Sequence, residues 1–128
     1  MGQQQLMLMI LSVIVVGLAI AVGIWIFTAN INVTNRDNII ADLNNMGADA
    51  FQYKIRPTTL GGGNGTYVGY TIPPAWGSAN ENASYFVTGT VSSTYIAFHA
   101  SSKVVEGGTV DIEFDGAGHT EGPVSAGF

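Results

Sequence analysis

The first 35 residues of this 128-residue chain contain no Asp, Glu, Lys or Arg. Cysteine is absent from the whole chain, so no disulfide can stabilise the fold. Lys and Arg together number only four, against nine Asp and Glu, which gives a net charge of −5. Nucleic-acid binding needs clustered basic side chains to neutralise phosphates, so this composition predicts no nucleic-acid partner.

An apolar segment occupies the part of the chain that lacks charge. In residues 6–27, which number 22, Ser12 is the only polar side chain. As a helix this segment measures roughly 33 Å, enough to cross the hydrocarbon core of a bilayer. A secretory signal peptide is disfavoured, because the preceding residues carry no basic side chain and the run is too long. A single-span anchor fits the hydropathy, but the nearest basic residues all follow the span, which favours a cytoplasmic remainder unless a basic leader once preceded Met1.

The order of segments resembles that of processed type IV pilins and their relatives, the type II secretion pseudopilins and the archaeal pilins and flagellins. These share an uncharged apolar helix, an amphipathic continuation and a small β-rich head. The resemblance covers residues 1–56 by motif and the remainder by general architecture. Gly2-Gln3 before the apolar run resembles the region processed by prepilin peptidase. Either Met1 is the mature N-terminus, open to N-methylation, or Gly2 is the last leader residue; we favour Met1.

Two departures from the family pattern affect the helix. Many bacterial pilins place a glutamate near its start, where this chain has Gln5. A neutral Gln still accepts a hydrogen bond at a lower desolvation cost, but the charge pair with a neighbour's terminal amine is lost. The family's helix-breaking proline is also absent, and Gly17 and Gly23 weaken a helix by at most about 1 kcal/mol each. We therefore expect a largely unbroken helix in the assembled state.

The patterns and the resemblance predict an α+β fold with a long helix over residues 1–56 and a β-rich head over 57–128. Residues 1–28 form the membrane or filament-core segment, and 29–56 form an amphipathic segment that packs on the head. Residues 28–34 favour helix poorly, and Thr34 can cap a new start, so two helices meeting near residue 30 remain an alternative to the single helix that the resemblance favours. Pro57 ends the helix. Its apolar face is predicted from a spacing of three and four residues, at Ile39, Ile40, Leu43, Met46, Ala50 or Phe51, and Ile55.

The head is predicted as an antiparallel meander laid over the amphipathic helix. The predicted strands are residues 66–72, 85–91, 94–100 and 109–114, with a tight turn at Ser92-Ser93 and an irregular tail from Gly116 to Phe128. The glycine-rich segment 61–65 is interpreted as a turn, because no Lys-Ser or Lys-Thr follows it as in a phosphate-binding loop. Core or interface positions are predicted for the large aromatic residues Tyr53, Tyr67, Tyr70, Trp76, Tyr85 and Tyr95.

Few residues of the head suggest chemistry. Asp111, Glu113 and Asp115 alternate before a glycine, which fits either the opening of a calcium loop or the charged face of an edge strand. His99 in a predicted strand and His119 in a loop have no ligand or catalytic partners at suitable spacing, so we expect no zinc site and no enzyme, and no cofactor apart from the calcium alternative. Sequons for N-glycosylation begin at Asn32, Asn64 and Asn82 and allow, without requiring, surface glycosylation of an exported chain.

The resemblance implies a structural subunit of an extracellular pilus-like filament, with a precursor pool in the cytoplasmic membrane. Its partners would be many identical subunits, a prepilin peptidase and an assembly ATPase. The alternative is a monomeric, membrane-anchored exported domain that binds a partner through the head. The small residues Gly17, Ala19, Ala21 and Gly23 allow close approach of neighbouring helices. The predicted filament-core positions are Leu6, Leu8, Ile10, Ile14, Gly17, Ala21, Gly23 and Ile26, and the polar start comprises Met1, Gly2 and Gln5.

Overall fold

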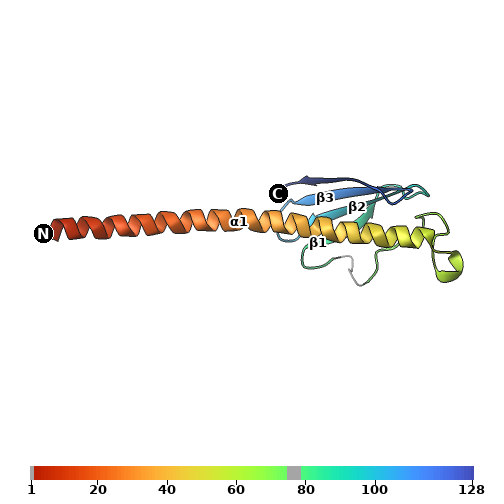
Figure 1. Ribbon diagram of the computed structural model, residues 1–128, viewed down its shortest axis with the longest axis horizontal. Coiled ribbons are helices and arrows are strands. Elements are labelled where there is room, and N and C mark those ends of the chain that lie inside the picture. Colours follow the sequence, from red (N-terminus) through yellow and green to blue (C-terminus); the bar gives the residue numbers. More distant parts are fainter. Residues whose placement is uncertain (1, 75–78) are drawn as a thin grey trace. The chain divides into compact units, whose positions relative to one another are not determined.

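The computed structural model describes residues 2–74 and 79–128. It contains a helix α1 (Gly2–Ile55) and a short 3-10 helix η1 (Thr58–Leu60), followed by the strands β1 (Ala83–Thr88), β2 (Tyr95–Ser102), β3 (Thr109–Asp115) and β4 (Thr120–Ala126) (Figure 1). The predicted α+β class is therefore confirmed. The chain divides into two compact units, one ending at Asn32 and the other comprising Val33–Phe128, and α1 contributes to both.

Helix α1 is a single element, so the alternative of two helices meeting near residue 30 is wrong. Thr34 lies within the helix and does not cap a new one. The β-branched and Asn residues of this stretch lower helix propensity by only a few tenths of a kcal/mol each, which packing of the following turns readily offsets. The helix ends at Ile55, two residues before Pro57, as the restriction on the residue before a proline requires.

The glycine-rich segment after α1 serves as its C-terminal cap. The backbone NH groups of Gly63, Asn64 and Gly65 donate to the carbonyls of Tyr53, Arg56 and Lys54 at 2.7, 3.0 and 2.6 Å. These carbonyls would otherwise lack partners at the helix end. A Cβ atom at Gly63 would lie 1.9 Å from the Thr66 carbonyl oxygen, so the close approach requires glycine. The interpretation of this segment as a turn is confirmed.

Within the second unit, α1 lies along one face of a sheet with strand order β1-β2-β3-β4, all antiparallel (Figure 1). Side chains alternate between the two faces of β1 to β3, and the apolar ones facing the helix are buried, except for the half-buried Val87. The predicted helical face supplies the other half of the core. The core comprises Ile39, Leu43, Met46, Ala50, Tyr67, Tyr70, Ala83, Tyr85, Ile96, Phe98, Ala100, Val110, Ile112 and Phe114.

Aromatic rings run through this core as a series of edge-to-face contacts. Tyr53 and Tyr70 have ring centroids 5.7 Å apart, and Phe98 lies 6.0 Å from Tyr70 and 5.9 Å from Phe114. Such pairs add about 0.5–1.5 kcal/mol each beyond area burial. Three predicted aromatic core residues, Tyr67, Tyr70 and Tyr85, are buried, and Tyr53 and Tyr95 are half-buried. Trp76 lies outside the described residues.

The predicted strand at residues 66–72 is wrong. Tyr70 NH donates to Tyr67 carbonyl at 3.0 Å across a four-residue turn, and Gly69 has φ +88°. A positive φ at the third position is the requirement of a type II turn and favours glycine there. The alternating aromatic residues that suggested a strand instead point into the core from a loop, with Tyr67 and Tyr70 buried and Val68 exposed.

The tail predicted to be irregular contains β4, which pairs with β3 and has all seven residues exposed. The sequence did not predict this strand because it contains Gly122 and Pro123, and both residue types are uncommon in strands. An edge strand tolerates proline because its outward-facing NH groups need no partner, and the register shift opposite Asp111 and Glu113 accommodates the extra residue.

Two smaller predictions also need correction. Ile55 is 63% exposed, although its spacing placed it on the apolar face. It lies roughly 120° around the helix from Leu43, whose side chain is fully buried, because each residue turns the helix by about 100°. The turn predicted at Ser92-Ser93 lies one residue further on, since Ser92 NH donates to the Tyr95 carbonyl at 2.9 Å and encloses residues 93 and 94.

Candidate assembly surface

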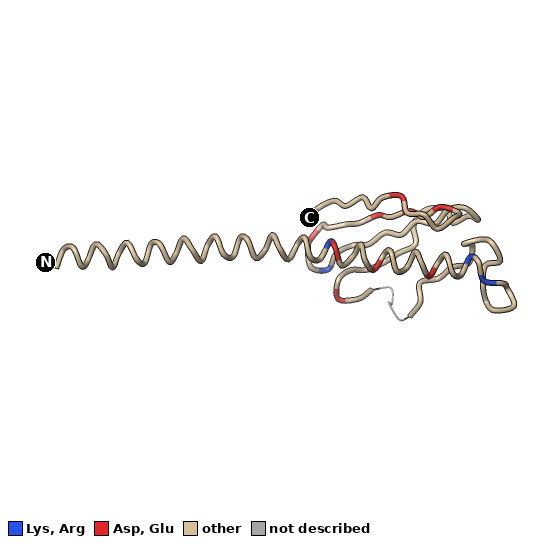
Figure 2. Tube along the Cα trace, viewed as in Figure 1, with Lys and Arg blue, Asp and Glu red and all other residues tan. Residues whose placement is uncertain are grey.

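The first unit exposes an apolar surface on every side of α1. An 18-residue window of the helix has a mean hydropathy of 2.9 with none of its residues buried, so the helix is long and apolar enough to span a membrane. Figure 2 shows no charged residue along this part of α1. The predicted packing positions are all exposed, including Leu6 at 59% and Ile26 at 49%. Such a surface is stable only in lipid or against other apolar surfaces.

The two hydroxyl groups on this surface are already satisfied. Ser12 Oγ donates to the Leu8 carbonyl at 2.7 Å, and Thr28 Oγ1 donates to the Ile24 carbonyl at 3.0 Å. Both bonds lie within the helix, so neither hydroxyl donor needs water or a partner chain. The surface can therefore enter a dry environment at little polar cost.

The small residues fall on two opposite sides of the helix. Gly17 and Ala21 are four residues apart and share one side, whereas Ala19 and Gly23 share another, about 200° away at roughly 100° per residue. A Cβ atom at Gly17 or Gly23 would meet nothing within 4 Å. Both sides are thus open to close approach by another helix.

The polar start precedes this surface. Gly2 and Gln5 are exposed in the first turns of α1, and Met1 lies outside the described residues. The N-terminal amide groups of a helix have no intrahelical partners, so the glutamine side chains of residues 3–5 lie where additional hydrogen bonds are needed. From the sequence we predicted these residues as a polar start whose glutamine side chains bond to adjacent chains, and that pairing stays a prediction.

The head contains a polar cluster that sequence analysis missed. Asp42 Oδ2 accepts hydrogen bonds from Tyr85 Oη at 2.5 Å, Asn80 Nδ2 at 2.8 Å and Asn82 Nδ2 at 3.2 Å. Burial raises the pKa of the Tyr85 phenol well above its usual range, and the bond to Asp42 raises this pKa further. The cluster fastens the segment before β1 to α1. The only sequence signal was an acidic residue beside the apolar face of the helix.

The proposed calcium-binding residues lie on β3, not in a loop. Asp111 Oδ1 is 2.5 Å from His99 Nδ1, and alternate residues of a strand are separated by about 7 Å. Among the described residues, no three His, Asp or Glu side chains are grouped to hold a metal ion. The other interpretation of Asp111, Glu113 and Asp115, as the charged face of an edge strand, is correct about the strand. It is wrong about the edge, because β3 is paired on both sides.

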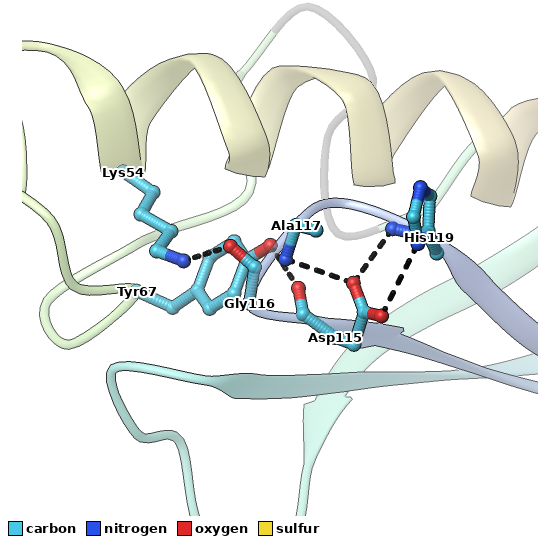
Figure 3. Close-up of polar contacts among 6 residues, drawn as sticks. All are labelled: Lys54, Tyr67, Asp115, Gly116, Ala117 and His119. Atoms are coloured by element: carbon cyan, nitrogen blue, oxygen red, sulfur yellow. Dashed lines mark hydrogen bonds and ion pairs between the residues drawn. The ribbon is translucent and has the colours of Figure 1, made fainter.

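The turn between β3 and β4 is fixed to the end of α1 (Figure 3). The Asp115 carboxylate accepts from the NH groups of His119 and Ala117 at 2.8 and 2.9 Å, and the His119 NH lowers its pKa most strongly. Tyr67 Oη donates to the Asp115 carbonyl at 2.7 Å, and Lys54 Nζ donates to the Gly116 carbonyl. Lys54 also lies over the Tyr67 ring, 5.1 Å from its centroid. These contacts hold the β3–β4 turn against the end of α1.

The three sequons differ in their surroundings. Asn32 lies within α1, Asn64 is exposed in the capping loop, and Asn82 is half-buried with its amide nitrogen bonded to Asp42.

Comparison with protein-family models, curated proteins and solved structures gives no match.

Proposed function

We propose that this chain is the structural subunit of a helical, pilus-like filament outside the cell, and that it polymerises through the apolar part of α1. The observation that carries the proposal is the exposed, uncharged surface of residues 6–27 in a chain whose second unit has its own core. A second unit with a complete core can change neighbours without unfolding, whereas the apolar helix must be covered by lipid or by other subunits at every stage.

The energetics favour reversible transfer between membrane and filament. Lipid tails and the Leu, Ile and Val side chains of other subunits are about equally apolar, so transfer gains little hydrophobic free energy. Close packing between helices and the loss of lipid contacts then decide the balance. An assembly ATPase encoded elsewhere would extract subunits from the membrane, after a prepilin peptidase has processed them. The role is structural and not catalytic.

Two opposite small-residue sides suit a filament better than a dimer. A helix in a dimer needs one close contact, whereas a helix in a bundle contacts neighbours on both sides. Gly17 with Ala21 serves one neighbour, and Ala19 with Gly23 serves the other. The subunit therefore presents two different contact surfaces, which is the heterologous arrangement that builds an open helix.

Electron microscopy of material purified from the producing cells tests the proposal. We expect filaments with a regular helical repeat, composed of this chain alone. A membrane-anchored binding domain would instead yield detergent-solubilised monomers without a repeat, and this result would overturn the proposal. Mass spectrometry of the same filaments identifies the mature N-terminus and any methyl group on it.

Tryptophan substitutions test the packing. Gly17→Trp with Ala21→Trp, and separately Ala19→Trp with Gly23→Trp, should each abolish filaments while the precursor still fractionates with membranes. The matched control, Leu18→Trp with Val22→Trp, places the same pair on the side between them and should assemble. Normal filaments from either small-residue variant would contradict two-sided helix packing.

A further inference from the structure

We infer that Asn64 is an acceptor site for an N-linked glycan and that Asn32 and Asn82, although they begin sequons, are not acceptors in the folded chain. The inference rests on the exported location of the head in the proposed function. The three sites share a sequence motif, so only their surroundings separate them.

Asn64 occupies the most accessible of the three surroundings. It is exposed, and at φ 51° it is the only described residue other than glycine with a positive φ. Its backbone NH is bonded to the Arg56 carbonyl at 3.0 Å, which holds the loop, while its side chain is exposed to solvent. Attaching a sugar there breaks no contact of the head.

The hydroxyl residue of the same sequon is also accessible. Thr66 is half-buried, and its Oγ1 accepts a hydrogen bond from the Val68 NH at 3.1 Å. Because the oxygen is used only as an acceptor there, the hydroxyl hydrogen remains available to a transferase. The flanking Gly65, at φ +96°, keeps the segment between Asn64 and Thr66 free of a bulky side chain. A loop at a helix end also opens at lower free-energy cost than the interior of a helix or sheet.

Asn32 is unsuitable because it lies within α1. Side chains two residues apart on a helix point about 200° away from each other, so Asn32 and Thr34 cannot face one enzyme together. Recognition of both would require several helical hydrogen bonds to break.

Asn82 is unsuitable for a different reason. Its Nδ2 atom, the nucleophile in glycosylation, donates to Asp42 Oδ2 at 3.2 Å. The next residue, Ala83, is fully buried, and Ser84 is paired with Ser101 in the sheet. Glycosylation would have to pull the start of β1 out of the core.

The co-reactant is an oligosaccharide linked to a polyprenyl phosphate or diphosphate. Asn64 Nδ2 attacks the anomeric carbon of the first sugar, so a C–N bond forms and the bond from this carbon to the phosphate oxygen breaks. The amide nitrogen gives up one proton to water or to a base of the transferase, and the polyprenyl phosphate or diphosphate leaves with the bonding electron pair. No oxidant or reductant is required.

The test uses the full chain in membrane vesicles with an oligosaccharyltransferase and a polyprenyl-diphosphate oligosaccharide of known mass. Three synthetic peptides, one for each sequon, provide the intrinsic rates. We expect the folded chain to gain the mass of one glycan, attached to Asn64 at a rate close to that of its peptide. Asn32 and Asn82 should react at least about tenfold more slowly than their peptides, which corresponds to an opening cost of about 1.4 kcal/mol.

Substitutions separate the acceptor from the fold. Asn64→Gln should abolish the mass shift, and so should Thr66→Ala, which keeps the asparagine in place. The matched control Asn82→Gln should retain it. A folded chain that stays unmodified at Asn64 while its peptide reacts, or one that reacts at Asn82 as fast as the peptide, overturns the inference.

Glycopeptide mapping of material from the producing cells distinguishes this inference from the proposed function. Filaments whose subunits carry no glycan on Asn64 contradict the acceptor site alone. Chains that carry the glycan but never form filaments contradict the proposed function and leave the acceptor site intact.

Discussion

Gly47 offers a quantitative test of how α1 packs against the sheet. A Cβ atom at this buried glycine would lie 1.9 Å from Cζ of Phe114 and 2.3 Å from Cε1. Carbon atoms in contact normally lie about 3.5–4.0 Å apart, so the ring would have to retreat by roughly 1.5 Å or more. Phe114 is only 3% exposed and packs edge-to-face on Phe98, so it has little room to move.

The substitution Gly47→Ala sets helix propensity against overpacking. Alanine gains about 0.8–1 kcal/mol over glycine within a helix, whereas overpacking a dense core costs about 1–3 kcal/mol. The depth of the overlap places the cost at the upper end of that range. We therefore expect the free energy of unfolding of the head to fall by about 2 kcal/mol.

Urea unfolding of the full chain in detergent micelles, followed by near-ultraviolet circular dichroism, measures this change. Ala48→Gly is the matched control, because it alters the propensity of the next, exposed position and should cost about 1 kcal/mol without any clash. In the Phe114→Leu background, Gly47→Ala should cost at least about 1 kcal/mol less, since the smaller side chain relieves the overlap. A Gly47→Ala protein as stable as the wild type, or more stable, would refute the packing of α1 on β3.

Three further predictions concern polar contacts of the head. The folded-state pKa of Tyr85 is raised, chiefly by burial, so its contribution to stability is complete below the unfolded pKa of about 10 and is lost as the pH rises further; Tyr85→Phe should flatten stability measured from pH 9 to 11. The pKa of Asp115 is lowered, first by the His119 NH, so its contribution is present above about pH 4 and lost as the pH falls; Asp115→Asn should reduce the acid dependence of amide exchange in the β3–β4 turn. Asn35 is 4% exposed, and its side chain bonds to the Asn82 carbonyl and the Ser102 hydroxyl. Asn35→Ala should therefore lower the free energy of unfolding by about 1–3 kcal/mol. The control Asn45→Ala, at an exposed position, should change it by about 0.5 kcal/mol or less.

Each of these has a clear contrary result. If Tyr85→Phe leaves the loss of stability between pH 9 and 11 unchanged, burial and Asp42 do not raise the pKa of the Tyr85 phenol in the folded chain. If Asp115→Asn leaves the acid dependence of amide exchange unchanged, the Asp115 carboxylate does not stabilise the β3–β4 turn. Equal effects at Asn35 and Asn45 would show that the buried amide bonds contribute nothing to stability.

The sequence alone predicted the features that depend on residues close together in the chain. The absence of charge before Arg36 and the apolar run predicted a helix long enough to span a membrane, and the spacing of Ile39, Leu43 and Met46 predicted the buried face of its continuation. Three of the four predicted strands were confirmed, with small shifts at their ends. These features depend on the period of a helix or strand, which each segment carries by itself.

The remaining features depended on partners distant in the chain. β4 exists because β3 offers it a hydrogen-bonding edge, and the aromatic residues at 67 and 70 enter the core from a turn because Gly69 permits a positive φ. Likewise, the three sequons share one sequence pattern, and only the structure distinguishes them. Asn82 Nδ2, for example, donates a hydrogen bond to Asp42, 40 residues away in the sequence. The sequence alone determined which segments must leave water, because hydrophobicity belongs to the residues themselves. Only the tertiary structure decided which polar groups are occupied and which stay accessible, because hydrogen bonds require a partner at the right distance.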